Sequence, residues 1–216
     1  MALEGTVEKV VFSIDGVGAA GLMPLCLKLA LQRSMPNCEV RNFFWSHGYG
    51  RMLADLKDRA HIRLKASMLA SEIEGLRAEQ KQVQIVAKSG GSAVALDALA
   101  LLKPDTVQTV VLLSPAVSPQ YDLGPPLQAV QTKLYAFNSS LDQFMLGLGT
   151  SVFGTADGIK TRAAGCVGFS APDRYEKLEE IPWHPRMIRG LNFGTHWGTS
   201  MLPFLSEHVV PLLNLE

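Results

Sequence analysis

The chain has 216 residues, of which 47% are hydrophobic and 19% are charged, a composition that supports a well-buried core and argues against disorder. Twenty basic and twenty acidic side chains cancel, which argues against a nucleic-acid partner or an anionic membrane surface and favours a small-molecule partner. The three cysteines, Cys26, Cys38 and Cys166, are widely separated and form no CxxC pair. Neither a disulfide framework nor a zinc site is therefore expected.

No signal peptide is expected, because the first residues, MALEGTVEKVV, lack a basic segment followed by an apolar one. No later apolar run reaches the roughly 18 to 20 residues of a membrane span. We therefore expect a cytoplasmic chain without a membrane span. We also expect one domain over residues 1–216 and a monomer or small homo-oligomer.

Short apolar and β-branched runs alternate with longer helical patterns, which is typical of a parallel sheet covered by helices on both faces. The expected strands, in chain order, are residues 7–14, 39–45, 83–88, 107–113, 132–138 and 163–169. The expected helices are residues 22–33, 53–80, 92–102, 141–148 and 200–213. The predicted fold class is therefore α/β, a three-layer sandwich around a mostly parallel, doubly wound six-stranded sheet.

A glycine-rich turn follows the first expected strand, with the spacing Gly16-x-Gly18-x-x-Gly21 of a dinucleotide-binding fingerprint. Such a site also needs an acidic residue at the end of the second strand to hold the ribose hydroxyls. That strand ends Asn42-Phe-Phe-Trp-Ser46, without a carboxylate. The missing carboxylate weakens the case for a dinucleotide site, but the glycine spacing keeps a domain that binds NAD or FAD as an alternative function.

A serine stands at the turn from the third expected strand to the third expected helix, in Ala87-Lys-Ser89-Gly-Gly91. Small neighbours let strand and helix approach without a Cβ collision, and a sharp bend there lifts the hydroxyl clear of the sheet. A serine that merely caps the helix is the simpler interpretation. The arrangement resembles the nucleophile elbow, G-x-S-x-G, of the α/β-hydrolase superfamily, with Ala87 in place of the first glycine.

In that superfamily the catalytic residues follow in the order serine, acid, histidine. The resemblance implies Ser89 as nucleophile, Asp142 after the fifth expected strand as acid, and His196 in a glycine-flanked loop as base. The imidazole takes the serine proton, and the carboxylate fixes the imidazole tautomer. Two alternatives remain open. Asp157 lies in an Asp-Gly dipeptide, which is commoner as a turn, and His184 lies between two prolines.

The resemblance also assigns a role to the glycine-rich turn. With the strand order 2-1-3-4-5-6, the loops that leave the first and third strands face each other. The N–H groups of Val17 and Gly90 would then form the oxyanion hole. The supporting glycines, Gly16, Gly18 and Gly91, would allow the close backbone approach.

Besides Ala87, Asp15 departs from the superfamily pattern, because a histidine is usual at its position, and the sequence does not explain this departure. Lys88 occupies the variable position directly before the serine, and the sequence does not decide which way its ammonium points. A His-Gly motif that includes His47 and Tyr49 follows the second strand. Because that strand lies on the far side of the first strand from the serine turn, we expect His47 and Tyr49 at the rim of the pocket rather than in the oxyanion loop.

The expected function is hydrolysis of a carboxylic ester or thioester of a small-molecule substrate through an acyl-enzyme, without a cofactor or metal. A non-catalytic binding protein of the same fold is the other alternative. Apolar residues near the proposed catalytic loops suggest a pocket for an apolar acyl or alcohol group: Phe44, Trp45, Phe144, Met145, Leu146, Phe153 and Trp197.

Overall fold

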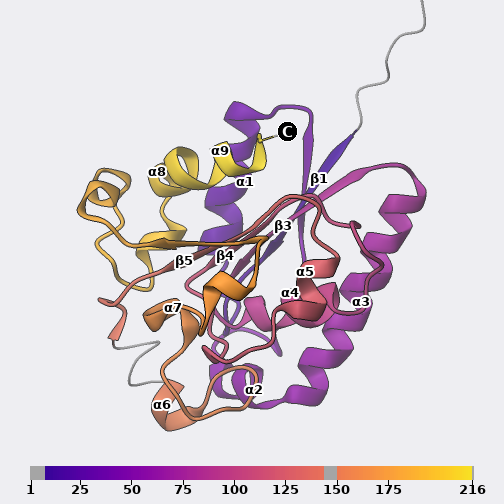
Figure 1. Cartoon of the computed structure of the whole chain (residues 1–216). Helices are drawn as coiled ribbons and strands as arrows, with labels where there is room; N and C mark the ends of the chain where they lie inside the picture. Colours follow the sequence, from indigo (N-terminus) through magenta and orange to yellow (C-terminus); the bar gives the residue numbers. More distant parts are fainter. Residues whose placement is uncertain (1–7, 144–149, 216) are drawn as a thin grey trace, which may run out of the picture.

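The computed structural model describes residues 8–143 and 150–215. Its six strands form one all-parallel sheet in the order β2-β1-β3-β4-β5-β6, which confirms the predicted fold class and strand order (Figure 1). The strands are β1 (Lys9–Ile14), β2 (Cys38–Asn42), β3 (Gln82–Lys88), β4 (Val110–Leu113), β5 (Leu134–Asn138) and β6 (Leu178–Pro182).

Helices cover both faces of the sheet (Figure 1). One face packs against α3 (Arg59–Ala78), α4 (Gly91–Leu99) and α5 (Gly124–Gln128), and the other against α1 (Leu22–Ser34), α8 (Leu202–Phe204) and α9 (Val210–Leu213). The short helices α2 (Met52–Lys57), α6 (Thr150–Phe153) and α7 (Ala164–Val167) lie in connecting segments. Within the described part of the chain, no helix combines the length and apolarity needed to cross a membrane.

The central strands are apolar on both sides because both faces are covered. In β1, Val10 and Phe12 belong to the core on the α3–α4 face, while Val11 between them belongs to the core on the α1 face. In β3, Val86 faces α1 and Ala87 faces the other layer. By the same alternation Lys88, the last residue of β3, points toward the α1 face.

The sixth expected strand was placed wrongly. Its residues, 163–169, include the helical turn α7, and the sixth strand is β6, which pairs with β5. As an edge strand β6 is only partly buried and carries Glu179 and Glu180, so its sequence lacks the apolar run by which the inner strands were recognised. Trp45 lies beyond the end of β2, and β4 begins at Val110 rather than residue 107.

One of the expected helices is divided, and another is continuous but irregular. The expected helix 53–80 is divided into α2 and α3 at Asp58, whose side chain caps α3 by accepting a hydrogen bond from the His61 N–H at 2.9 Å. The expected helix 200–213 contains a π-helical segment, Leu205–Val209, just before Pro211. Proline cannot donate the next helical hydrogen bond. Most of the expected helix 141–148 lies outside the described residues, and Asp142 itself is not helical.

Candidate active site

Ser89 occupies a strained turn between β3 and α4. Its φ of 50° is in the left-handed region, which a non-glycine residue seldom adopts. The turn is tight because α4 starts against the end of β1. A Cβ on Gly91 would overlap the carbonyl oxygen of Asp15 and lie 2.9 Å from Cγ2 of Ile14. Glycine at position 91 is therefore required by the approach of two backbones.

His196 and Asp142 form a buried pair. Nδ1 of His196 lies 2.8 Å from Oδ2 of Asp142, and the two residues are 7% and 3% exposed. The loop after β5 holds the acid, because the Asp142 N–H donates to the Ser139 carbonyl at 3.0 Å. The hydroxyl of Ser139 in turn donates to the Gly194 carbonyl at 2.7 Å. The loops of the acid and the histidine are thus joined directly.

The two alternative residues have other partners. The carboxylate of Asp157 accepts hydrogen bonds from the N–H and the hydroxyl of Ser118, at 2.8 and 2.5 Å. His184 is exposed, and its Nδ1 accepts from the Arg186 N–H at 3.2 Å at the start of a 3₁₀ turn. Asp157 anchors a loop and His184 caps a helical turn, so the structure brings neither to Ser89.

Ser89 and His196 line one cavity of about 230 Å³, whose walls include Gly16, Val17 and Trp197. Tyr49, predicted at the rim, lines it as well. No hydrogen bond joins the Ser89 hydroxyl to the imidazole among the contacts of the described residues. Catalytic hydrogen bonds are often long in the free protein and shorten when substrate binds.

The N–H groups of the glycine-rich turn bind carboxylates of the chain itself. Oδ1 and Oδ2 of Asp15 accept from the N–H groups of Gly16 at 2.8 Å and Gly21 at 2.6 Å. The Gly18 N–H donates to Oδ2 of Asp55 at 2.7 Å. These donors would hold the phosphates in a dinucleotide site. Because carboxylates already take them, the turn is not organised for a phosphate.

Gly16 and Val17 of this turn lie against the elbow. A Cβ on Gly16 would be 3.2 Å from the Cβ of Ser89, and a Cβ on Gly90 would be 2.7 Å from Cγ1 of Val17. No acceptor from the described residues takes the N–H of Val17 or of Gly90. Two backbone donors without partners therefore belong to the two loops that meet at Ser89.

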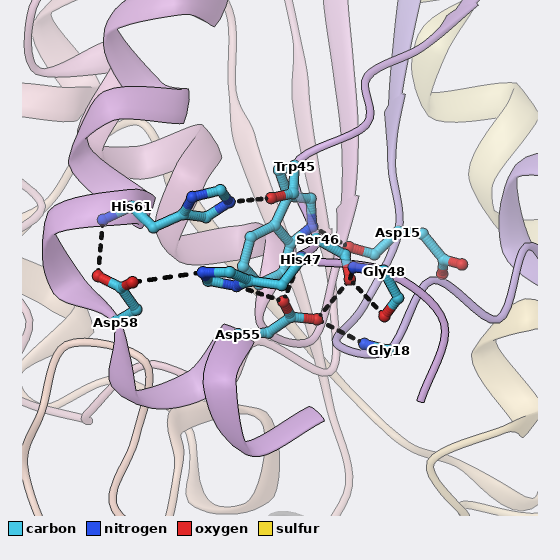
Figure 2. Close-up of polar contacts among 9 residues, drawn as sticks. All are labelled: Asp15, Gly18, Trp45, Ser46, His47, Gly48, Asp55, Asp58 and His61. Carbon is cyan, nitrogen blue, oxygen red and sulfur yellow. Dashed lines mark hydrogen bonds and ion pairs between the residues drawn. The ribbon is translucent and has the colours of Figure 1, made fainter. Parts of the chain in front are cut away.

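Asp55, in α2, joins the loop after β1 to the loop after β2 (Figure 2). The residue is fully buried. Besides the Gly18 N–H, its carboxylate accepts from the Ser46 hydroxyl at 2.7 Å and from the N–H and Nδ1 of His47 at 2.7 and 3.0 Å. Burial would raise the pKa of Asp55, but these hydrogen bonds outweigh it and hold the pKa below its ordinary value. The ionised carboxylate of Asp55 thus fixes both the loop after β1 and the loop after β2.

The loop after β2 has further anchors on α3 and on the turn after β1 (Figure 2). The ring of His47 stacks on His61 with 3.9 Å between centroids, and its Nε2 lies 3.3 Å from Oδ2 of Asp58. Nε2 of His61 is 2.5 Å from the carbonyl oxygen of Trp45, and the indole N–H of Trp45 donates to the Asp15 carbonyl at 2.8 Å. His47 therefore supports the loop from outside the cavity.

Lys88 ties the histidine loop to the elbow. The residue is 3% exposed, and its ammonium donates to the carbonyl of His196 at 2.6 Å, the hydroxyl of Ser200 at 2.6 Å and the hydroxyl of Thr199 at 3.2 Å. Three acceptors match the three protons of an ammonium group. Burial lowers the pKa of Lys88 to about 8, although the negative charges of Asp15 and Asp142 act to raise it.

The charge of Lys88 also acts on His196. Burial lowers the pKa of the His196 imidazole from its ordinary value of 6.5, the hydrogen bond with Asp142 opposes this, and the Lys88 ammonium lowers the pKa further. The positive charge next to the proposed nucleophile therefore favours the neutral imidazole, which is the form able to accept a proton.

Sequence reasoning missed Asp55. It stands 37 residues from Gly18 in the chain, and no motif surrounds it. Three of the apolar residues expected to line a pocket, Phe144, Met145 and Leu146, lie outside the described residues, as does the side chain of Phe153. No group of three His, Cys, Asp or Glu side chains in the described ranges is placed to hold a metal ion.

No protein-family model and no curated protein matches the sequence, but its structure resembles several solved ones. A lipase-esterase related protein from Clostridium acetobutylicum ATCC 824 superposes with a TM-score of 0.56 at 10% identity, over 96% of this chain and 95% of that one. A protein described as a hydrolase of the alpha/beta superfamily, from Xanthomonas campestris pv. campestris, superposes with a TM-score of 0.52 at 13% identity, over 95% and 99%.

An uncharacterised protein from Capnocytophaga ochracea DSM 7271 gives a TM-score of 0.54 at 10% identity; the match covers 95% of this chain but only 56% of that protein. At such low identities structural likeness establishes architecture and leaves activity to be argued from the site. The sheet order, the strained serine turn and these likenesses together show that the chain has the α/β-hydrolase fold.

Proposed function

We propose that this protein is a serine hydrolase that cleaves carboxylic esters or thioesters of small molecules, with Ser89 as nucleophile, His196 as base and Asp142 as the acid that orients it. The observation that carries the proposal is the arrangement of these three residues. The buried His196–Asp142 pair is bonded through Nδ1, which leaves Nε2 to act in the cavity that the imidazole shares with Ser89.

In the proposed reaction the Ser89 hydroxyl loses its proton to Nε2 of His196 as its oxygen bonds to the substrate carbonyl carbon. The carbonyl electron pair moves onto its oxygen, which we place at the N–H groups of Val17 and Gly90. Collapse of the resulting tetrahedral intermediate breaks the bond to the alcohol or thiol, which leaves with the proton from His196. Water then attacks the acyl-enzyme, giving its proton to His196, and release of the acid returns that proton to Ser89.

Two features of the site support this assignment, the backbone donors at the proposed oxyanion position and the protonation state of His196. The N–H groups of Val17 and Gly90 have no other acceptor from the described part of the chain, so no hydrogen bond within that part has to break when an oxyanion binds there. The neutral form of His196 is favoured by burial and by Lys88. Both features support catalysis near neutral pH without a bound metal ion or cofactor in the proposed steps.

The test is covalent labelling with a fluorophosphonate probe, with the adduct located by mass spectrometry. We expect labelling on Ser89 that is lost in Ser89→Ala and in His196→Ala. Ser114→Ala is the matched control, because Ser114 is also a buried serine with a φ of 50°, at the end of β4. This variant should label like the wild type. A folded wild-type protein that remains unlabelled would overturn the proposed function.

A further inference from the structure

A second, larger cavity of about 460 Å³ lies beside the one that holds Ser89. It runs between the start of α1 and the loop after β2, and its size is in the range of ligand-binding pockets. Leu25 and Pro24 of α1 form one wall, and Phe43 and Phe44 after β2 form the other. Leu25 and Phe44 are 58% and 78% exposed. The opening is therefore apolar on both sides.

The two cavities share a wall. Asp15 and Gly16 line both of them. Gly16 also packs against Ser89, because a Cβ added to Gly16 would lie 3.2 Å from the Cβ of Ser89. A molecule whose carbonyl carbon lies at Ser89 is thus one residue of backbone away from the larger cavity. Because the two cavities adjoin at these shared residues, the occupant that we assign to the larger cavity is another part of the same substrate.

The walls of the larger cavity are held in place before any ligand arrives. Trp45 and Ser46 line it, and both belong to the hydrogen-bonded group around Asp15 and Asp55 (Figure 2). Gly48, another lining residue, donates its N–H to the Ser46 hydroxyl at 3.0 Å. A preformed pocket binds an apolar group at a lower entropic cost than a flexible one.

The charges in this cavity select against an anion. Among the described residues that line it, the charged ones are Asp15 and Lys28, of opposite sign. Both carboxylate oxygens of Asp15 accept hydrogen bonds, from the N–H groups of Gly16 and of Gly21, the residue before α1, so an anion of the chain itself already lies at this end of the cavity. An uncharged group suits this environment, and the apolar walls favour a hydrocarbon.

We propose that the groove between the start of α1 and the loop after β2 binds the unbranched apolar chain of the ester substrate, across Gly16 from the nucleophile. This inference rests on the proposed function and adds a substrate class, esters with a hydrocarbon chain of medium length. The chain can belong to the acyl or to the alcohol part. Two series of esters separate these cases: p-nitrophenyl acetate, butyrate and octanoate for the acyl part, and ethyl, butyl and octyl acetate for the alcohol part.

Leu25→Trp is the test variant because the indole ring of tryptophan is larger than the leucine side chain and narrows the groove. Leu29→Trp is the matched control, since Leu29 lies one turn further along the same helix, is 39% exposed and does not line the groove. We expect Leu25→Trp to lower kcat/KM about tenfold for the octanoate or octyl ester. The same variant should leave the acetate or ethyl ester within about twofold. Phe44→Ala should also weaken selectivity for the long chain, and Leu29→Trp should not.

A second measurement does not depend on hydrolysis. In Ser89→Ala, 1-octanol should shift the indole N–H signal of Trp45, which lines the groove, and leave that of Trp183, which donates to the Asn192 carbonyl elsewhere. Equal kcat/KM losses for short and long esters, or an unmoved Trp45 signal, would overturn the groove assignment. An unlabelled, hydrolytically inactive wild type with a shifted Trp45 signal would overturn the proposed function and, with it, the assignment of the groove to an ester substrate, although the groove would still bind an apolar chain.

Discussion

Nδ1 of His196 lies 2.8 Å from Oδ2 of Asp142, while Asp157, the other acid in the same part of the chain, binds Ser118. The sequence offered both acids, and the fold brings one of them to the histidine. A carboxylate in this position holds the imidazole in the tautomer that presents Nε2 to a nucleophile. The pair therefore makes the proposed mechanism directly testable by exchanging each acid for its amide.

Asp142→Asn should lower kcat for a short ester by about 10³- to 10⁴-fold, because an amide can donate to Nδ1 and so stabilise the wrong tautomer. Asp157→Asn is the control. It should leave kcat unchanged and cost about 1 to 3 kcal/mol of unfolding free energy, through its two hydrogen bonds with Ser118. Steady-state kinetics and urea unfolding measure the two effects. Similar kcat losses in both variants would contradict the assignment.

The acidic limb of kcat/KM should lie below pH 6.5. Activity is lost as the pH falls through the pKa of His196, because the imidazolium cannot accept the serine proton, and burial with Lys88 lowers that pKa from 6.5. Lys88→Met removes the nearby positive charge, so the pKa rises and the limb moves to higher pH. Lys103→Met, at an exposed position, is the control. A limb unmoved by Lys88→Met would show that this charge does not reach the base.

Asp55→Asn should lower kcat/KM by about 10²-fold, the size expected when a catalytic group is displaced by about 1 Å. The amide cannot accept all four hydrogen bonds that fix the loops after β1 and β2. Asp58→Asn should change kcat/KM by less than about threefold, because asparagine also caps a helix. Titration of active sites with fluorophosphonate corrects for unfolded protein. A loss explained entirely by fewer active sites would assign Asp55 a purely structural role.

Gly91→Ala should destabilise the fold by about 1 to 3 kcal/mol, because the added Cβ overlaps the Asp15 carbonyl and approaches Ile14. Gly75→Ala is the matched control. Gly75 lies in α3 with nothing within 4 Å of an added Cβ, so alanine should stabilise the protein by about 0.5 to 1 kcal/mol. Chemical unfolding measures both. Equal effects of the two substitutions would contradict the close approach of α4 to the end of β1.

Much of the fold follows from local patterns. The inner strands β1, β3, β4 and β5 are buried on both faces and therefore appear in the sequence as apolar runs. The edge strand β6 does not, because solvent reaches it and its glutamates are tolerated there. The division of the expected helix 53–80 at Asp58 was not predicted either, because apolar periodicity alone does not show that a side chain caps a new helix there.

The sequence by itself determined the fold class, because apolar runs that alternate with helical patterns predict a covered parallel sheet, and the small residues around Ser89 determined the serine turn. The strand order was expected from the resemblance to the α/β-hydrolase superfamily, and the structure confirms it. Only the tertiary structure decided that Asp142 rather than Asp157 meets His196, that carboxylates take the N–H groups of the glycine-rich turn, and that Lys88 binds the histidine loop. Apart from that of Asp15 with its own turn, each of these contacts joins residues that lie far apart in the sequence. Their geometry arises because parallel strands bring the segments at their carboxyl ends to one edge of the sheet.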